Sequence, residues 1–234
     1  MDNMNPRNIA LLIDADNASH NGIDAVLTVL AELGQVNIRR AYGNWRKTSL
    51  KGWVDKMHRY GIEPQQQFDL TKGKNATDMK MTIDALDLLY GGRVHGFGIM
   101  SSDSDFMPLA MRIRQDGYPV YGFGNPKTPE AFREACTRFI DVQALMKADE
   151  PRKDANTSAP DSELVQLLVD AYNNSKRDAQ GFAKLSEVGQ RAGNRSSFDV
   201  RNYGFARLTD MIETIPNFTH ERRENGAVWI KRLR

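Results

Sequence analysis

Two aspartates follow an apolar run of the sequence at the point where that run ends. Residues 94–100 predict a buried strand, and residues 106–115 carry a helical pattern. Asp103 and Asp105 lie in the polar turn between them. The sequence therefore places two carboxylates between a buried strand and a helix.

A second strand end carries the same chemistry. Residues 8–13 predict a buried strand that runs directly into Asp14 and Asp16. In an open α/β sheet, ligands bind at the carboxyl ends of the strands. Carboxylates crowded there repel one another unless a cation joins them. We therefore predict a site for Mg²⁺ or Mn²⁺, ions that prefer oxygen ligands and can activate water at a phosphoryl group.

Ordinary structural roles compete with this interpretation. Asp103 and Asp105 could simply cap the following helix, and Asp14 and Asp16 could be turn residues. Asp78 sits in the first turn of the helix predicted over residues 77–90, where an acidic residue is common on helix-dipole grounds.

Asp84 lies six positions beyond Asp78 on the same predicted helix. An ideal helix points the two side chains in well-separated directions. We therefore interpret Asp84 as a solvated or structural residue rather than a ligand.

A basic and aromatic stretch covers residues 38–60. It holds seven Lys or Arg residues and one acid, with Tyr and Trp residues between them. Such a mixture suits phosphates and unstacked bases. Trp53 fits a core position better than a binding role, whereas Arg46 and Lys47 follow a strand end and are expected at the same edge as the aspartates.

Short apolar stretches alternate with helical patterns over residues 8–146. This alternation predicts an α/β domain with a mostly parallel sheet sandwiched by helices. The predicted strands are residues 8–13, 36–41, 62–68, 94–100 and 119–123, and the predicted helices are residues 22–33, 50–60, 77–90, 106–115 and 129–135.

The pattern changes at residues 147–160, a polar stretch with two prolines that we interpret as a linker. Residues 161–234 then predict a small winged-helix domain. Its three helices are expected at residues 162–173, 185–192 and 201–214, and its hairpin around Asn225 and Gly226.

The winged-helix segment is only weakly basic, with 12 Lys or Arg residues and 10 acids. Six of its arginines could bind phosphate, although a solvated surface explains them equally well: Arg191, Arg195, Arg201, Arg207, Arg222 and Arg223.

Composition excludes several other classes of protein. The chain has 234 residues, 40% of them hydrophobic, and a net charge of +2. Cys136 is its single cysteine, so neither an internal disulfide nor a cysteine-based zinc site can form. No apolar run approaches the length of a membrane span, and the first residues lack the apolar segment of a signal peptide. We therefore expect a cytoplasmic protein with no membrane partner.

The first domain resembles the NYN domain, a branch of the PIN-like nucleases, and within it the LabA-like bacterial members. The matching motifs are residues 12–17 (LIDADN), residues 74–78 (KNATD) followed by Ile83 and Asp84, and residues 101–106 (SSDSDF). The resemblance implies a metal-dependent ribonuclease. It assigns Asp14, Asp78, Asp103 and Asp105 as catalytic metal ligands and Asn17 as a polar neighbour, while Asp16 and Asp84 match less critical positions.

The second domain resembles the LOTUS domain, also called OST-HTH. The motifs are residues 182–189 (FAKLSEVG), 199–205 (DVRNYGF) and 208–212 (LTDMI), although Ala183 stands where an apolar β-branched residue is usual. This resemblance implies a winged helix associated with RNA binding.

These features together predict a metal-dependent endoribonuclease that acts on single-stranded RNA. Asn17, Arg46, Lys47, Lys72 and Lys74 are the predicted substrate-binding residues. Two alternatives remain open at this point: a non-catalytic RNA-binding or regulatory adaptor, and a phosphatase that acts on small phosphates. The winged helix could also serve a homodimer or a protein partner.

Overall fold

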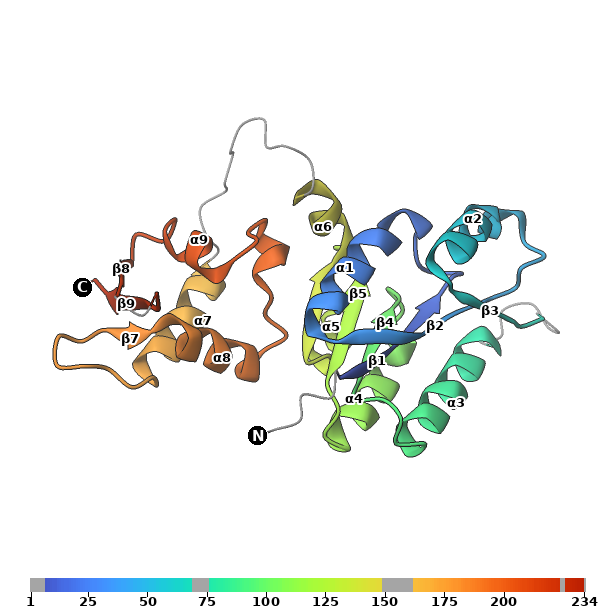
Figure 1. Cartoon of the computed structure of the whole chain (residues 1–234), viewed down its shortest axis with the longest axis horizontal. Helices are drawn as coiled ribbons and strands as arrows, with labels where there is room; N and C mark the ends of the chain where they lie inside the picture. The colour runs from blue at the N-terminus through green and yellow to red at the C-terminus, as the bar shows by residue number, and fades with distance from the viewer. Residues whose placement is uncertain (1–6, 69–75, 149–161, 224–225, 234) are drawn as a thin grey trace. The chain divides into compact units, whose positions relative to one another are not determined.

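A six-stranded parallel sheet forms the centre of the N-terminal part of the chain (Figure 1). The computed structural model describes residues 7–68, 76–148, 162–223 and 226–233, and the chain divides into two compact units, Met1–Met146 and Lys147–Arg234. In the order β3-β2-β1-β4-β5-β6, the strands are Glu63–Gln66, Gln35–Gly43, Asn8–Asp14, Gly96–Met100, Val120–Gly124 and Arg138–Asp141.

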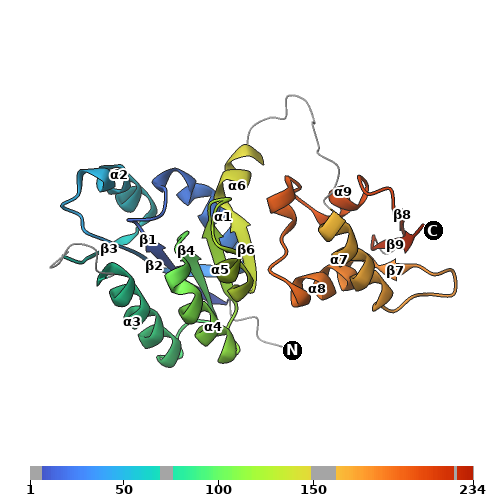
Figure 2. The same ribbon diagram turned by 180° about the vertical axis from the view of Figure 1, so that it is seen from behind.

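Helices cover both faces of this sheet (Figure 2). Side chains alternate along β1, so that Ile9, Leu11 and Ile13 enter one core cluster while Ala10 and Leu12 enter the other. The first cluster includes residues of α1 (Ile23–Leu33), α2 (Lys51–Tyr60) and α6 (Val142–Ala148), and the second includes residues of α3 (Ala76–Tyr90), α4 (Met107–Gln115) and α5 (Glu130–Ala135).

The strand order reverses between β1 and β4, which are parallel neighbours although more than 80 residues separate them in sequence. Ile13 pairs with Met100 at the carboxyl ends of the two strands. Such a reversal leaves a crevice at this edge of the sheet, where ligands bind in open α/β folds. The two strand ends that carry the predicted aspartates therefore lie side by side.

The structure confirms the predicted α/β fold and adds two elements at the end of the first unit. The sequence pattern does not predict strand β6, because β6 is a four-residue edge strand with only two large apolar residues, Phe139 and Ile140. Helix α6 was also not predicted, and it extends through Lys147 to Ala148, so the first two residues of the predicted linker are helical. Residues 149–161 of that linker lie outside the described part of the chain.

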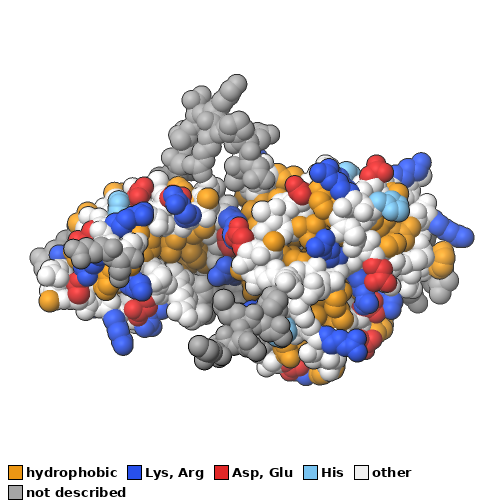
Figure 3. All heavy atoms as spheres, in the orientation of Figure 1, with side chains coloured by type: hydrophobic (Ala, Val, Ile, Leu, Met, Phe, Trp, Pro, Cys, Tyr) orange, Lys and Arg blue, Asp and Glu red, His pale blue; other side chains and the backbone are white. Residues whose placement is uncertain are grey.

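The C-terminal unit has its own apolar core, built by two longer helices and a three-stranded sheet. The sheet has the antiparallel order β7-β9-β8 and contains the predicted hairpin, although Asn225 itself lies outside the described residues. Acidic and basic side chains are intermixed on the face drawn in Figure 3. The elements are α7 (Ser162–Asn173), β7 (Ala183–Lys184), α8 (Leu185–Arg195), η4 (Val200–Tyr203), α9 (Leu208–Ile212), β8 (Phe218–Arg222) and β9 (Val228–Arg232).

The prediction of one continuous helix over residues 201–214 is wrong. The structure has a 3-10 turn, η4, followed by the short helix α9. Asp199 caps the start of η4, and Gly204 ends it with a φ of 77°, in the left-handed region that glycine adopts without steric cost. The apolar spacing along this segment concealed the break, because both pieces still pack against the same core.

Candidate metal centre

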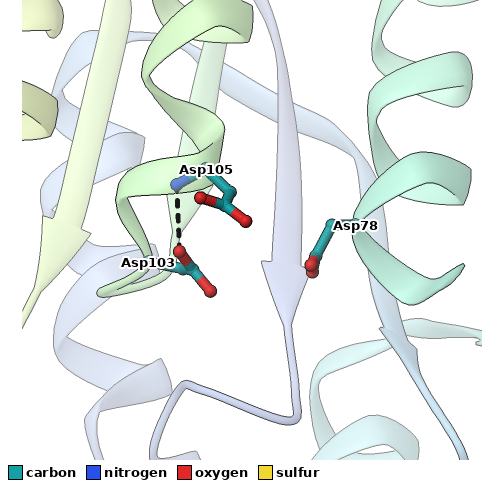
Figure 4. A group of neighbouring side chains, drawn as sticks. All are labelled: Asp78, Asp103 and Asp105. Atoms are coloured by element: carbon teal, nitrogen blue, oxygen red, sulfur yellow. Dashed lines mark hydrogen bonds between the residues drawn. The ribbon is translucent and has the colours of Figure 1, made fainter. Parts of the chain in front are cut away.

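Three carboxylates from two segments far apart in sequence converge at the carboxyl edge of the sheet (Figure 4). Asp78 lies in the first turn of α3, and Asp103 and Asp105 lie in the turn that follows β4. One oxygen of each carboxylate lies within 4.8 Å of the others. Asp78 and Asp103 are half-buried, whereas Asp105 is exposed. The arrangement offers a cation three oxygen ligands and one side open to solvent.

Local hydrogen bonds hold the turn after β4 in shape. The backbone N–H of Asp105 donates to Oδ1 of Asp103 at 2.9 Å, which makes Asp103 the cap of the 3-10 turn η3 (Ser104–Phe106). The backbone N–H of Asp103 donates in turn to Oγ of Ser101 at 3.1 Å. Asp103 therefore caps η3 through its Oδ1, the structural role that competes with a ligand role for this residue.

Asp14 lies fully buried at the end of β1. Its Oδ2 accepts hydrogen bonds from Ser101 Oγ at 2.7 Å and from Asn17 Nδ2 at 2.9 Å, and its Oδ1 accepts one from the backbone N–H of Asn17 at 3.2 Å. Burial raises the pKa of Asp14, and these hydrogen bonds oppose the rise. Asp14 is not a member of the three-carboxylate group, and its role as a fourth metal ligand stays a prediction.

The electrostatics of Asp78 show that the site is rich in negative charge. The pKa of Asp78 is raised to about 6, first by burial and then by the charges of Asp14, Asp103, Asp105 and Asp16. A divalent cation would relieve this repulsion, and hard oxygen ligands suit Mg²⁺ or Mn²⁺. The residues present therefore fit the predicted ions.

Asp16 belongs to a different set of contacts. Its Oδ1 pairs with Lys47 Nζ at 3.1 Å, and its Oδ2 accepts a hydrogen bond from Thr77 Oγ1 at 3.3 Å. Asp16 thereby connects the loop after β2 to the start of α3, the helix that carries Asp78. Lys47, a predicted substrate-binding residue, lies at the predicted edge and is held there by Asp16.

Asp84 serves the core, in line with its predicted structural role. Its carboxylate accepts hydrogen bonds from Tyr42 Oη at 3.0 Å and from Lys80 Nζ at 2.6 Å, and Arg40 Nη1 lies 3.7 Å away. These contacts join α3 to β2. Trp53 is likewise fully buried, as the core interpretation predicted.

The remaining predicted binding residues differ in how far the structure describes them. Arg46 is exposed beside Phe68, with its guanidinium carbon 5.0 Å from the ring centroid. Lys72 and Lys74 lie outside the described residues. In the C-terminal unit, five of the six predicted arginines form ion pairs with acids of their own unit: Arg191, Arg195, Arg201, Arg207 and Arg223.

Sequence reasoning missed Ser101, which is fully buried and bridges two aspartates of the site. It stands immediately after β4, where a serine reads as an ordinary turn residue. Its position in the strand pairing could have identified it. Met100 pairs with Ile13, so Ser101, the residue after Met100, lies next to Asp14, the residue after Ile13.

The sequence model of the NYN domain matches residues 8–145, and that of the OST-HTH/LOTUS domain matches residues 156–230. The chain belongs to the NYN domain family and carries an OST-HTH/LOTUS domain after its NYN domain. NYN domains form part of the PIN-like nuclease superfamily, which supports hydrolase chemistry, and the OST-HTH domain supports RNA binding.

Two individual proteins are similar to the NYN part of the chain. The uncharacterized protein MJ0482 of Methanocaldococcus jannaschii is 27% identical over 120 residues, which cover 50% of this chain and 47% of that protein. The match thus spans about half the length of that relative. The crystal structure of VPA0982, a protein of unknown function from Vibrio parahaemolyticus, has a TM-score of 0.50 at 18% identity, over 61% of this chain and 96% of that one. This second similarity concerns the fold alone.

Among the residues that the structure describes, no helix has the length and apolar character needed to cross a membrane.

Proposed function

We propose that the protein is a metal-dependent endoribonuclease that cleaves phosphodiesters of single-stranded RNA. The observation that carries the proposal is the convergence of Asp78, Asp103 and Asp105 within 4.8 Å at the switch point of a sheet of the NYN family. The OST-HTH domain supports RNA as the substrate.

Asp78, Asp103 and Asp105 would hold Mg²⁺ or Mn²⁺, and Asp14 would add a fourth carboxylate from the end of β1. When bound, the ion supplies Lewis-acid stabilisation of the phosphoryl group and a hydroxide nucleophile at neutral pH.

The protein's own residues would position the RNA. Lys47 lies at the same edge and is held by Asp16, so it offers positive charge to a phosphate beside the carboxylates. Arg46, Lys72 and Lys74 would contact further phosphates. Asn17 is exposed and donates to Asp14, which places a polar amide next to the site.

The replacement Asp103→Asn tests this proposal. Asparagine keeps the side-chain oxygen that accepts from the Asp105 N–H, so the turn is preserved, while the negative charge for the ion is lost. Loss of a positioned metal costs several kcal/mol of transition-state stabilisation, so we expect cleavage to fall by about a thousandfold or more. Affinity for single-stranded RNA should change little.

Asp87→Asn is the matched control, because Asp87 is an exposed carboxylate further along α3. This variant should cleave RNA like the wild type. Wild-type turnover by Asp103→Asn would exclude Asp103 as a metal ligand. RNA binding without cleavage by the wild type at any divalent ion would favour an adaptor, and hydrolysis of a small chromogenic phosphate ester alone would favour a phosphatase.

A further inference from the structure

An exposed aromatic ring lies at the same edge of the sheet as the metal centre. Phe68 follows β3 by two residues and keeps 48% of its surface exposed. A single exposed apolar residue requires no explanation by itself. Phe68 differs from an isolated residue because the guanidinium of Arg46 lies over its ring, 5.0 Å from the centroid.

The loop that carries Arg46 is held from both sides. On one side, Gln66 of β3 accepts from the backbone N–H of Trp45 at 3.1 Å and donates to Asn44 Oδ1 at 3.2 Å. On the other side, Lys47 pairs with Asp16. These contacts fix the conformation of the loop around Arg46. A site that already has its binding geometry loses less conformational entropy when a ligand binds.

The strand register relates this pair to the metal centre. Asp14 pairs with Tyr42 of β2, and Tyr42 pairs with Gln65 of β3, so the three strands end nearly level. The backbone N–H of Gln67 continues the pairing by donating to Gly43 O at 3.1 Å. Adjacent strands lie about 4.8 Å apart, so β3 ends about 10 Å along the edge from Asp14.

We propose that Arg46 and Phe68 form a stacking site for one unpaired nucleobase of the RNA strand, a role that rests on the proposed function in taking RNA as the ligand. An aromatic face stacks on any base, and a guanidinium plane extends such a stack while attracting the negatively charged strand. A base held in a duplex is already stacked on its neighbours, so its faces are not available to this site. The pair would therefore select single-stranded RNA and anchor it beside the carboxylates.

A second arginine–aromatic pair supplies the matched control. Arg112 lies over Tyr90 at 5.8 Å, and Tyr90 is 66% exposed. This pair sits at the opposite end of α3 from Asp78, and Arg112 also pairs with Asp116 at 2.7 Å. Arg112 also donates hydrogen bonds from Nε and Nη2 to the Tyr90 hydroxyl, at 3.2 and 2.7 Å. The pair is therefore an exposed arginine–aromatic contact that lies away from the candidate metal centre.

The test compares single-residue variants of the full chain on two probes, with a chelator present so that binding is measured apart from cleavage. One probe is a single-stranded RNA oligonucleotide, and the other is the same ribose-phosphate backbone without bases. Fluorescence anisotropy gives the dissociation constant for each probe. The constant for the baseless strand divided by the constant for the RNA reports how much the bases contribute to affinity. Base stacking on an aromatic residue is worth about 1 kcal/mol or more, so Phe68→Ala should lower this ratio about fivefold or more. The affinity for the baseless strand should not change.

Phe68→Trp should keep the wild-type ratio, because the side chain remains aromatic. Phe68→Leu should lower the ratio as Phe68→Ala does, because leucine is apolar but has no aromatic face. Tyr90→Ala should behave like the wild type. An unchanged ratio in both Phe68→Ala and Phe68→Leu would overturn the stacking site, as would equal affinity of the wild type for both probes. These outcomes are distinct from failure of the proposed function, which would appear as an intact Phe68-dependent ratio in a protein that cleaves no RNA with Mg²⁺ or Mn²⁺.

Discussion

Ser101 Oγ donates a hydrogen bond to Asp14 Oδ2 at 2.7 Å, although 87 positions separate the two residues in sequence. Both residues are fully buried, and they join the ends of neighbouring strands β1 and β4. The same serine oxygen accepts from the backbone N–H of Asp103 at 3.1 Å. A single hydroxyl thus ties a buried carboxylate to the turn that carries two of the candidate metal ligands.

Replacement of Ser101 by alanine should therefore destabilise the protein. It removes one donor from a buried carboxylate and leaves the N–H of Asp103 without this acceptor, which we expect to lower the free energy of unfolding by about 1–3 kcal/mol. Urea denaturation measures this loss. Ser104→Ala is the control, because Ser104 lies exposed in the same turn and its replacement should have little effect. Equal stabilities of the two variants would show that the bridge contributes nothing.

The raised pKa of Asp78 predicts a pH-dependent effect of Asp78→Asn in the metal-free protein. In the unfolded chain Asp78 ionises at its ordinary pKa of 3.8, but in the folded protein only at about 6. Between these values the folded state binds more protons than the unfolded state, so this group lowers the free energy of unfolding as the pH rises. Asparagine carries no charge at any pH and avoids that loss.

We therefore expect Asp78→Asn to be more stable than the wild type at about pH 7.5 and to lose this advantage at about pH 4. Thermal or urea unfolding with a chelator present gives the comparison. A difference between the two proteins that stays constant with pH would contradict the raised pKa.

Metal binding should stabilise the folded protein, whatever its activity. An ion that binds only the folded state at a hundred times its dissociation constant stabilises it by about 2.7 kcal/mol. Mn²⁺ or Mg²⁺ should raise the Tm of the wild type, and Asp105→Asn should reduce this shift because it removes one of the three negative charges that would hold the ion. Differential scanning fluorimetry over a metal titration measures the shift. Asp87→Asn should respond like the wild type, and a full response from Asp105→Asn would remove that residue from the ligand set.

The two domains should divide their work on a long RNA. Each unit has its own apolar core, so removal of residues 151–234 should leave the NYN domain folded. We expect the KM for long RNA to rise and kcat on a short oligonucleotide to stay nearly constant, because the second domain raises the local concentration of substrate. The affinity of the shortened protein should also fall less steeply with salt, since it neutralises fewer phosphates.

Steady-state kinetics and a salt titration test this division. If truncation changes neither the KM for long RNA nor the salt dependence, a protein partner becomes the better assignment for the winged helix. Five of its six candidate arginines already form ion pairs with acids of their own unit, and these acids compete with RNA phosphates for the arginines.

Much of the fold followed from local patterns. Buried parallel strands are short apolar runs, and residues 94–100 and 8–13 have that pattern just before the turns that carry the aspartates. The same local reasoning failed at two places. The edge strand Arg138–Asp141 is too short to give a clear apolar pattern. Around Gly204 the helical spacing of apolar residues continues although the helix itself is interrupted.

The sequence by itself determined which side chains stand at strand ends and that their chemistry suits a hard cation. Only the tertiary structure decided which of them meet. Asp78 joins Asp103 and Asp105 because α3 packs on the sheet with its first turn at the carboxyl edge, whereas Asp84, on the same helix, turns to Tyr42 in the core. Asp14 is buried and accepts a hydrogen bond from Ser101, which follows the neighbouring strand β4. These outcomes depend on contacts between residues far apart in the chain, and the periodicity of a single strand or helix carries no information about its distant partners.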